Sequence, residues 1–213
     1  MPICCFWLEF ANLCEWGLRR YTSFDKDVEC TNGFHFHDGT VILGQHFARE
    51  IVDEGPSHLG EVHLCVDERI EKISWPPHDD PRWPRKCKRC AYQFTEDDQY
   101  QEWTSMLYRR SDNGELITLR ESSPGAMWDA VWYPWKGPDG RSVVVKLPNG
   151  HEWSIDGRAT NCTMPQDNEH HCWVRHGTPP KLTVDKNGRT CQAGAGSVQG
   201  GDYHGFLRDG CFT

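Results

Sequence analysis

Residues 141–156 read RSVVVKLPNGHEWSID, and this stretch decides the fold that the sequence predicts. It holds two short strand-like runs on either side of Pro-Asn-Gly. Three consecutive valines favour a strand, and Asn-Gly supplies the backbone angles of a tight turn at little steric cost. We therefore expect two short strands joined by a turn.

The same pattern extends over the C-terminal hundred residues. Short strand-like runs such as ELITL, AVWYPW, KLTVD and HGFL are separated by turns rich in Gly, Pro, Asn and Asp. This half of the chain is therefore predicted to be mostly β. Its tryptophans are expected to form the core rather than a stacking platform; they are Trp128, Trp132, Trp135 and Trp153.

Helix signals lie on the N-terminal side of this region. TEDDQYQEWTSMLYRRSDNG (95–114) opens on Thr95, continues with acidic residues and ends on Asn-Gly, which predicts a helix across roughly 96–110. A shorter helix is predicted in HFAREIVDEG (46–55), after a hairpin that turns at Asp38-Gly39. The expected fold class is α+β, with a small zinc-ribbon-like module, one helix and a β-rich C-terminal domain.

Three regions are predicted along the chain. Residues 1–60 form a mixed N-terminal segment, residues 61–94 a zinc-ribbon-like module with a proline-rich loop, and residues 95–213 the helix with the β-rich domain. The proline-rich stretch WPPHDDPRWP (75–84) is incompatible with a helix or a central strand, because each proline lacks a backbone donor.

Composition excludes several classes of protein. The net charge of −8 disfavours wholesale nucleic-acid binding, and no apolar run reaches the roughly 18 residues that cross a bilayer, so no membrane association is expected. Eleven cysteines without a recognisable signal peptide predict a reducing compartment, in which thiols are metal ligands or buried small side chains.

A zinc site is predicted at the Cys87-Lys88-Arg89-Cys90 motif. Two cysteines separated by two residues in a tight turn direct both sulfur atoms at one centre, and His63 and Cys65 offer the other two ligands. The prediction is one structural Zn²⁺ per chain on His63, Cys65, Cys87 and Cys90. A redox couple and unligated thiols are the alternatives.

A second group of ligand-type residues lies in NCTMPQDNEHHCWVRH (161–176). Its candidate metal ligands are Cys162, His171, Cys172 and His176, with His170 beside them and Cys191 later in the chain. Ordinary packing of the cysteines is the favoured interpretation of this group. His35 and His37, together with His46, have the alternation of the histidines in a metal-binding β-barrel, but two exposed histidines on a hairpin are the favoured interpretation. No complete catalytic constellation is found, so a protein without enzymatic activity is favoured.

Two C-terminal segments resemble a family of uncharacterised phage and prophage proteins. The resemblance covers roughly residues 75–213 and rests on PGAMWDA (124–130) and CWVRHG (172–177), preceded by the zinc-ribbon-like CxxC. It implies a phage origin but no assigned chemistry. A zinc-stabilised structural or protein-interaction module is therefore expected, with a phage or host protein as its partner. Its expected location is the bacterial host cytoplasm during infection or, as an accessory protein, the virion.

A nucleic-acid-binding zinc ribbon, or a metal-dependent nuclease-like enzyme using the Cys162 to His176 group, is the alternative. Four cationic residues surround the CxxC motif and form the candidate phosphate-binding set: Arg85, Lys86, Lys88 and Arg89.

Overall fold

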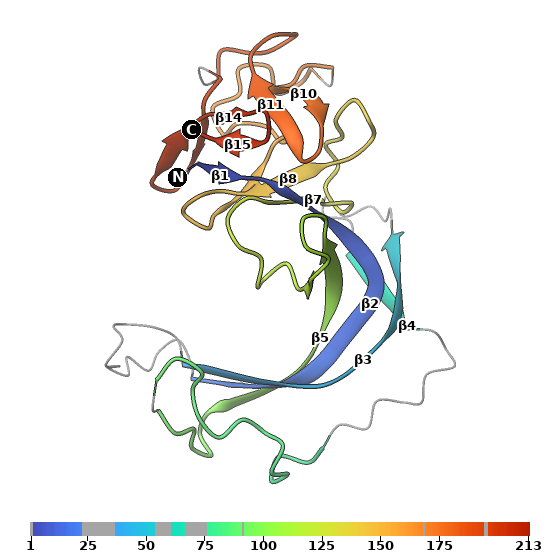
Figure 1. The fold of residues 1–213 in the computed structure, drawn as a ribbon, viewed down its shortest axis with the longest axis vertical. Helices are drawn as coiled ribbons and strands as arrows, with labels where there is room; N and C mark the ends of the chain where they lie inside the picture. Colours follow the sequence, from blue (N-terminus) through green and yellow to red (C-terminus); the bar gives the residue numbers. More distant parts are fainter. Residues whose placement is uncertain are drawn as a thin grey trace. The chain divides into compact units, whose positions relative to one another are not determined.

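The computed structural model describes residues 2–22, 37–53, 61–66, 76–90, 92–167, 169–193 and 196–213, and for residues 46–53 and 61–66 it describes the backbone alone. Every regular element in these ranges is a strand (Figure 1). The strands are β1 (Ile3–Cys4), β2 (Phe6–Tyr21), β3 (Asp38–Asp53), β4 (Glu61–Val66), β5 (Gln99–Arg110), β6 (Leu116–Ile117), β7 (Ala126–Asp129), β8 (Val143–Lys146), β9 (Glu152–Ser154), β10 (Val174–Thr178), β11 (Lys181–Asp185), β12 (Val198–Gly200), β13 (Tyr203–Gly205), β14 (Leu207–Arg208) and β15 (Cys211–Phe212).

The predicted α+β class is wrong, because the segment expected to be a helix is β5. Its N-terminal signals form a turn instead: the Thr95 backbone N–H donates to Asp98 Oδ2 at 2.6 Å, and the Asp98 N–H donates to the Thr95 carbonyl at 3.1 Å. At the other end, Gly114 has a φ of 76° in the turn between β5 and β6. The residues that start and stop a helix also favour turns. Here they form turns at the two ends of β5, which pairs with β2 and β6.

The second expected helix is also a strand. β3 runs without interruption from Asp38 to Asp53, so the predicted turn at Asp38-Gly39 is instead the start of a strand. Gly39 allows a close approach there, since a Cβ atom would lie 2.8 Å from both the Phe94 ring and the Pro84 side chain. Among the described residues no helix is long and apolar enough to span a membrane.

The chain divides into two compact units that are not continuous in sequence. The first contains Met1–Ala11, Glu50–Leu64 and Tyr108–Thr213, and the second contains Asn12–Arg49 and Cys65–Leu107. β2 contributes to both: it pairs in parallel with β7 through Phe6 to Leu8 and antiparallel with β3 through Leu13 to Tyr21.

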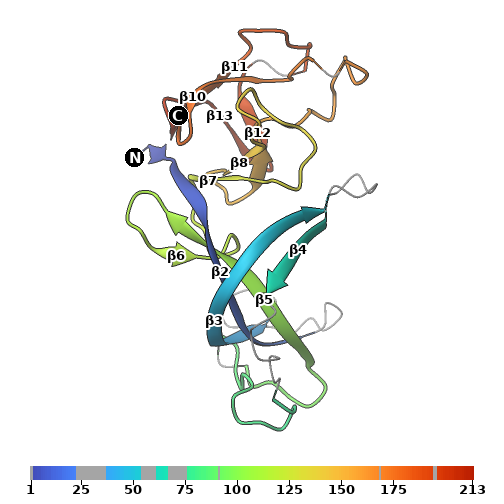
Figure 2. The same cartoon turned by 90° about the vertical axis from the view of Figure 1, so that its right-hand side faces the viewer.

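The first unit is built on the antiparallel meander β7-β8-β9, of which β7 and β8 are labelled in Figure 2. The predicted pair of strands in residues 141–156 is confirmed, with Val145 opposite Trp153 and Gly150 in the turn at a φ of 86°. Side chains alternate along a strand, so Val143 and Val145 share one face of β8, and Val144 on the opposite face is buried as well. The core on the face of Val143 and Val145 contains Met127, Val143, Val145, Leu147, Trp153, Ile155, Leu182, Val184, Val198, Leu207 and Phe212.

Hairpins β10–β11, β12–β13 and β14–β15 complete the first unit. β1 pairs with β15, so the N-terminal and C-terminal strands lie side by side (Figure 1). Cys4 and Cys211 face each other in this pair and form a disulfide. The expectation that the cysteines are thiols or metal ligands is therefore wrong for these two.

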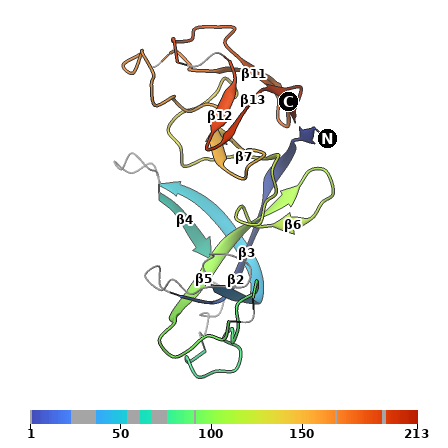
Figure 3. The ribbon, with the colours of Figure 1, turned by 90° about the vertical axis from the view of Figure 1, so that its left-hand side faces the viewer.

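The second unit contains the antiparallel β2–β3 pair and the part of β5 that precedes Tyr108 (Figure 3). The proline-rich stretch is a loop in its described part, as predicted. Trp83 anchors this loop: its side chain is buried, and its indole N–H donates to the Pro77 carbonyl at 2.9 Å.

Candidate metal centres

The described residues contain two groups of side chains that could hold a metal ion. Cys162, His170, Cys172 and Cys191 in the first unit are called the loop cluster, and His37, Cys87 and Cys90 in the second unit are called the knuckle cluster. Within each cluster the ligand atoms all lie within 4.8 Å of one another.

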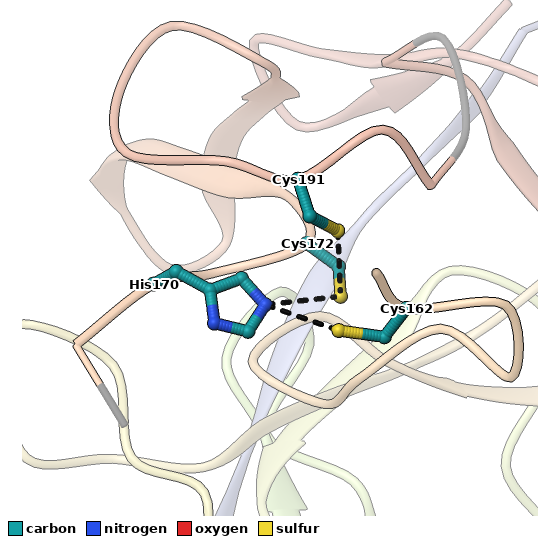
Figure 4. A group of neighbouring side chains, drawn as sticks. All are labelled: Cys162, His170, Cys172 and Cys191. Carbon is teal, nitrogen blue, oxygen red and sulfur yellow. Dashed lines mark hydrogen bonds between the residues drawn. The ribbon is translucent and has the colours of Figure 1, made fainter. Parts of the chain in front are cut away.

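Three separations between ligand atoms of the loop cluster, which is drawn in Figure 4, match those of a tetrahedral metal site. Zn–S bonds of about 2.3 Å and Zn–N bonds of about 2.1 Å place two sulfur ligands about 3.8 Å apart, and a sulfur and a nitrogen about 3.6 Å apart. The sulfur atoms of Cys172 and Cys191 are 3.6 Å apart. His170 Nε2 lies 3.2 Å from Cys162 Sγ and 3.8 Å from Cys172 Sγ. These separations agree with a shared ion to within about 0.4 Å.

A backbone hydrogen bond orients His170. Its Nδ1 lies 2.7 Å from the Asp167 carbonyl oxygen, which accepts only, so Nδ1 carries the proton. Nε2 then presents its lone pair to the sulfur atoms of Cys162 and Cys172 (Figure 4). Histidine ligands of metals are commonly fixed in this way by a carbonyl on the other ring nitrogen.

Backbone N–H groups also point at the sulfur atoms. Ala159 N–H donates to Cys172 Sγ at 3.3 Å, and Met164 N–H donates to Cys162 Sγ at 3.4 Å. Burial raises the pKa of Cys172. Burial also opposes ionisation of Cys191, but hydrogen bonds from the backbone at Ala193 and Thr163 and from the neighbouring thiols outweigh it and lower the Cys191 pKa. Such donors favour the thiolate, the form that binds metal.

Two cationic side chains tie the surrounding loops together. Lys186 Nζ donates to the carbonyl oxygens of Cys172 at 2.8 Å, Cys191 at 2.7 Å and Ala193 at 2.6 Å. Arg158 donates to the carbonyls of Met164, Pro165 and Asp167, in the segment that leads to His170. A divalent ion bound by three thiolates and a neutral imidazole would carry a net charge of −1, which the Lys186 ammonium would balance.

The loops around this cluster have little apolar material of their own. Their buried centre consists of Cys172, Cys191 and Ala193, with Ala159, Cys162, Met164 and Trp173 packed around it. Segments with so small a core generally need a metal or a disulfide to hold them. A metal ion bound by the loop cluster would supply that cross-link.

The structure brings together only part of the predicted second group. Cys162 and Cys172 lie in the loop cluster, but His170 and Cys191 accompany them rather than His171 and His176. His176 lies on β10, where its Nε2 is 2.9 Å from Asp185 Oδ1. The signal for His170 was the HxC spacing with Cys172, the same spacing that suggested His63 and Cys65 as ligands.

Of the predicted zinc ligands, Cys87 and Cys90 lie in the knuckle cluster with His37. His63 and Cys65 belong to β4, and their side chains lie outside the described part of the structure. His37 is buried, so the prediction that it is exposed on a hairpin is wrong. The side chains of His35 and His46 also lie outside the described residues.

Comparison with known proteins gave no match to any family model, to any curated protein or to any solved structure. The resemblance to phage and prophage proteins therefore stays a prediction.

Proposed function

We propose that this chain is a non-catalytic protein-interaction module whose first unit is held together by structural zinc in the loop cluster. The observation that carries the proposal is the set of four convergent ligands, three sulfur and one nitrogen. Four protein ligands close the shell of a zinc ion, whereas catalytic zinc keeps one position for water or substrate. We assign the ion as Zn²⁺ because thiolate-rich tetrahedral sites select zinc among common divalent cations.

An exposed aromatic loop supports the interaction role. In the loop between β7 and β8, the Trp132 and Tyr133 rings lie 6.2 Å apart and the Tyr133 and Trp135 rings 6.0 Å apart. Trp135 is 41% exposed, so the prediction that it belongs to the core is wrong. Aromatic side chains are enriched where proteins contact one another, and rigid rings cost little conformational entropy on binding. This loop is our candidate contact for a protein partner.

The zinc assignment is tested with two neighbouring histidines. His170→Asn removes a proposed ligand, whereas His171→Asn changes the adjacent residue and leaves the cluster intact. Native mass spectrometry should show one zinc ion fewer for His170→Asn and no change for His171→Asn. Chelation should lower the melting temperature of the His171→Asn protein and of the unmodified protein. Equal metal content in all three proteins would reject the assignment.

The interaction role is tested by crosslinking in cells. A photocrosslinking residue that replaces Trp135 should capture one defined protein, and the same residue at the exposed Lys181 should not. For the phage-associated form of the proposal, mass spectrometry of purified particles is the deciding measurement. Absence from particles rejects a virion role, and absence of a crosslinked protein at position 135 rejects the loop as the contact.

A second candidate function is nucleic-acid binding at the CxxC turn. Arg85, Lys86, Lys88 and Arg89 are all exposed, while Cys87 between them is buried. Each duplex phosphate neutralised should steepen the salt dependence of binding by about 0.9, so four contacts give a slope near −3.6. Neutralising the four residues should abolish binding to DNA and RNA at low salt. Binding indifferent to these changes removes this candidate.

A nuclease-like activity at the Cys162 to His176 group is not favoured, because the loop cluster already supplies four ligands and His176 is engaged with Asp185.

A further inference from the structure

We propose that the knuckle cluster is a second, independent site for a thiophilic divalent cation of the Zn²⁺ class, with His37, Cys87 and Cys90 as protein ligands. The sequence suggested a single ion per chain and did not assign His37 to it. The inference does not depend on the loop cluster, because the two clusters lie in different units of the fold.

The first argument is the geometry of the three ligand atoms. They lie within 4.8 Å of one another, and His37 Nδ1 is 3.2 Å from Cys90 Sγ. A nitrogen and a sulfur that share a zinc ion are expected about 3.6 Å apart. His37 is 1% exposed, Cys87 is buried and Cys90 is partly buried. The loop cluster likewise has one partly buried ligand, Cys162, and three buried ones.

The second argument is the backbone of the CxxC turn. Lys86 and Gln93 form an antiparallel bridge, and the Cys87 N–H donates to the Tyr92 carbonyl at 3.0 Å, so the motif sits in a tight hairpin. Within it, the Arg89 N–H donates to Cys87 Sγ at 3.4 Å. A backbone donor two residues after a cysteine stabilises its thiolate, the form that binds a metal ion.

The third argument is that the fold holds His37 against this turn. The next residue, Asp38, accepts a hydrogen bond from the Lys88 N–H at 2.9 Å. The His37 ring stacks on Tyr92 with centroids 4.3 Å apart and planes 14° apart. Tyr92 is fixed in turn, because its hydroxyl donates to Asp98 at 3.1 Å. The imidazole orientation is therefore set by packing before any ion binds, as expected of a preorganised ligand.

The main competing interpretation is a thiol pair with redox activity. A CxxC couple of the thioredoxin type opens a helix, whereas Cys87 and Cys90 lie in a β-hairpin. The buried His37 nitrogen close to the Cys90 sulfur supplies a third ligand of a metal shell. A fourth donor, either water or another group of the chain, fills the remaining position of the ion.

The test counts metal ions on the full-length protein. Native mass spectrometry should find two zinc ions per chain in the unmodified protein. The double variants Cys87→Ala/Cys90→Ala and Cys162→Ala/Cys191→Ala should each retain one. His37→Ala should lose zinc from the knuckle cluster, and His78→Ala, a change of an exposed histidine in the same unit, should retain both ions. Cys14→Ala controls for loss of a buried cysteine outside either cluster.

A second measurement does not require any variant to fold. In Co²⁺ titration of the metal-free protein, sulfur-to-cobalt charge-transfer absorption grows with the number of thiolate ligands. Two phases are expected, one for a site with three thiolates and one for a site with two.

A disulfide between Cys87 and Cys90 in the purified protein would overturn the inference. Saturation at one Co²⁺ would overturn it if the Cys87→Ala/Cys90→Ala variant still binds that ion. If instead only the Cys87→Ala/Cys90→Ala variant loses its ion, the inference stands and the loop-cluster assignment fails.

Discussion

Replacing Lys186 with methionine tests whether the loops and the metal ion form one cooperative unit. The Lys186 ammonium donates all three of its hydrogens to backbone carbonyls, and two of these carbonyls belong to Cys172 and Cys191 of the loop cluster. Methionine has a similar length but donates no hydrogen bond and carries no charge. Lys186→Met therefore removes both the tie between the loops and the charge that balances the metal centre.

The size of the effect follows from the three hydrogen bonds. Each contributes about 1 kcal/mol net, a value suited to a side chain that is only partly buried, for a total of about 3 kcal/mol. Because the core of these loops consists mainly of cysteines, we expect the loops to order only with the ion bound. The loss then appears in the zinc dissociation constant. At about 1.4 kcal/mol per factor of ten, the dissociation constant should rise about 100-fold.

The assay is competition for zinc between the protein and a chelating indicator. Lys186→Arg keeps the charge but not the three-way geometry, so its dissociation constant should fall between those of Lys186→Met and the unmodified protein. Lys181→Met changes an exposed lysine and serves as the matched control. A dissociation constant for Lys186→Met within threefold of the control would refute the coupling between Lys186 and the metal centre.

Three further predictions concern the first unit. Replacing Cys4 and Cys211 with serine should lower the free energy of unfolding, which urea denaturation measures. The disulfide closes a loop with a sequence separation of 207, so the chain-entropy model gives a loss of up to about 5 kcal/mol. Asp156→Ala removes a buried partner of Arg175 and should cost about 3 to 5 kcal/mol by the same assay, with Asp79→Ala, an exposed site, as the control. The hydrogen bond from Arg175 holds the pKa of Asp139 below its usual value of 3.8, so this carboxylate stabilises the fold above that pH and loses its contribution as the pH falls through the lower folded pKa. An Asp139→Asn protein should therefore show a weaker loss of stability below about pH 4.

The sequence predicted those features that are encoded by neighbouring residues. The valine run before Pro-Asn-Gly predicted the β8–β9 pair, because strand preference and turn chemistry are local properties. Thr95, Asp98 and Gly114 misled the prediction, since their side chains and backbone angles suit a helix end and a turn equally well. The pairing of β2 with β5 decided between these outcomes, and no local signal encodes that pairing.

The candidate metal ligands divide in the same way. Cys87 and Cys90 were found from their spacing, whereas His37 lies far upstream and reaches them only because β3 begins against the turn. Choosing His170 over His171 requires the loop conformation that Asp167 fixes through its carbonyl. The β10–β11 hairpin brings Cys191 back to Cys172. Rules based on the sequence spacing of ligands do not predict this contact.

The link between the first and last strands affects how the protein bears mechanical load. Tension applied to the chain before Cys4 and after Cys211 passes directly through the sulfur–sulfur bond. The polypeptide between Cys4 and Cys211, which contains both candidate metal centres, forms a closed loop that bears none of this tension. Stretching by the two ends should therefore leave the metal centres intact, and reduction of this one bond should expose them to the pulling force.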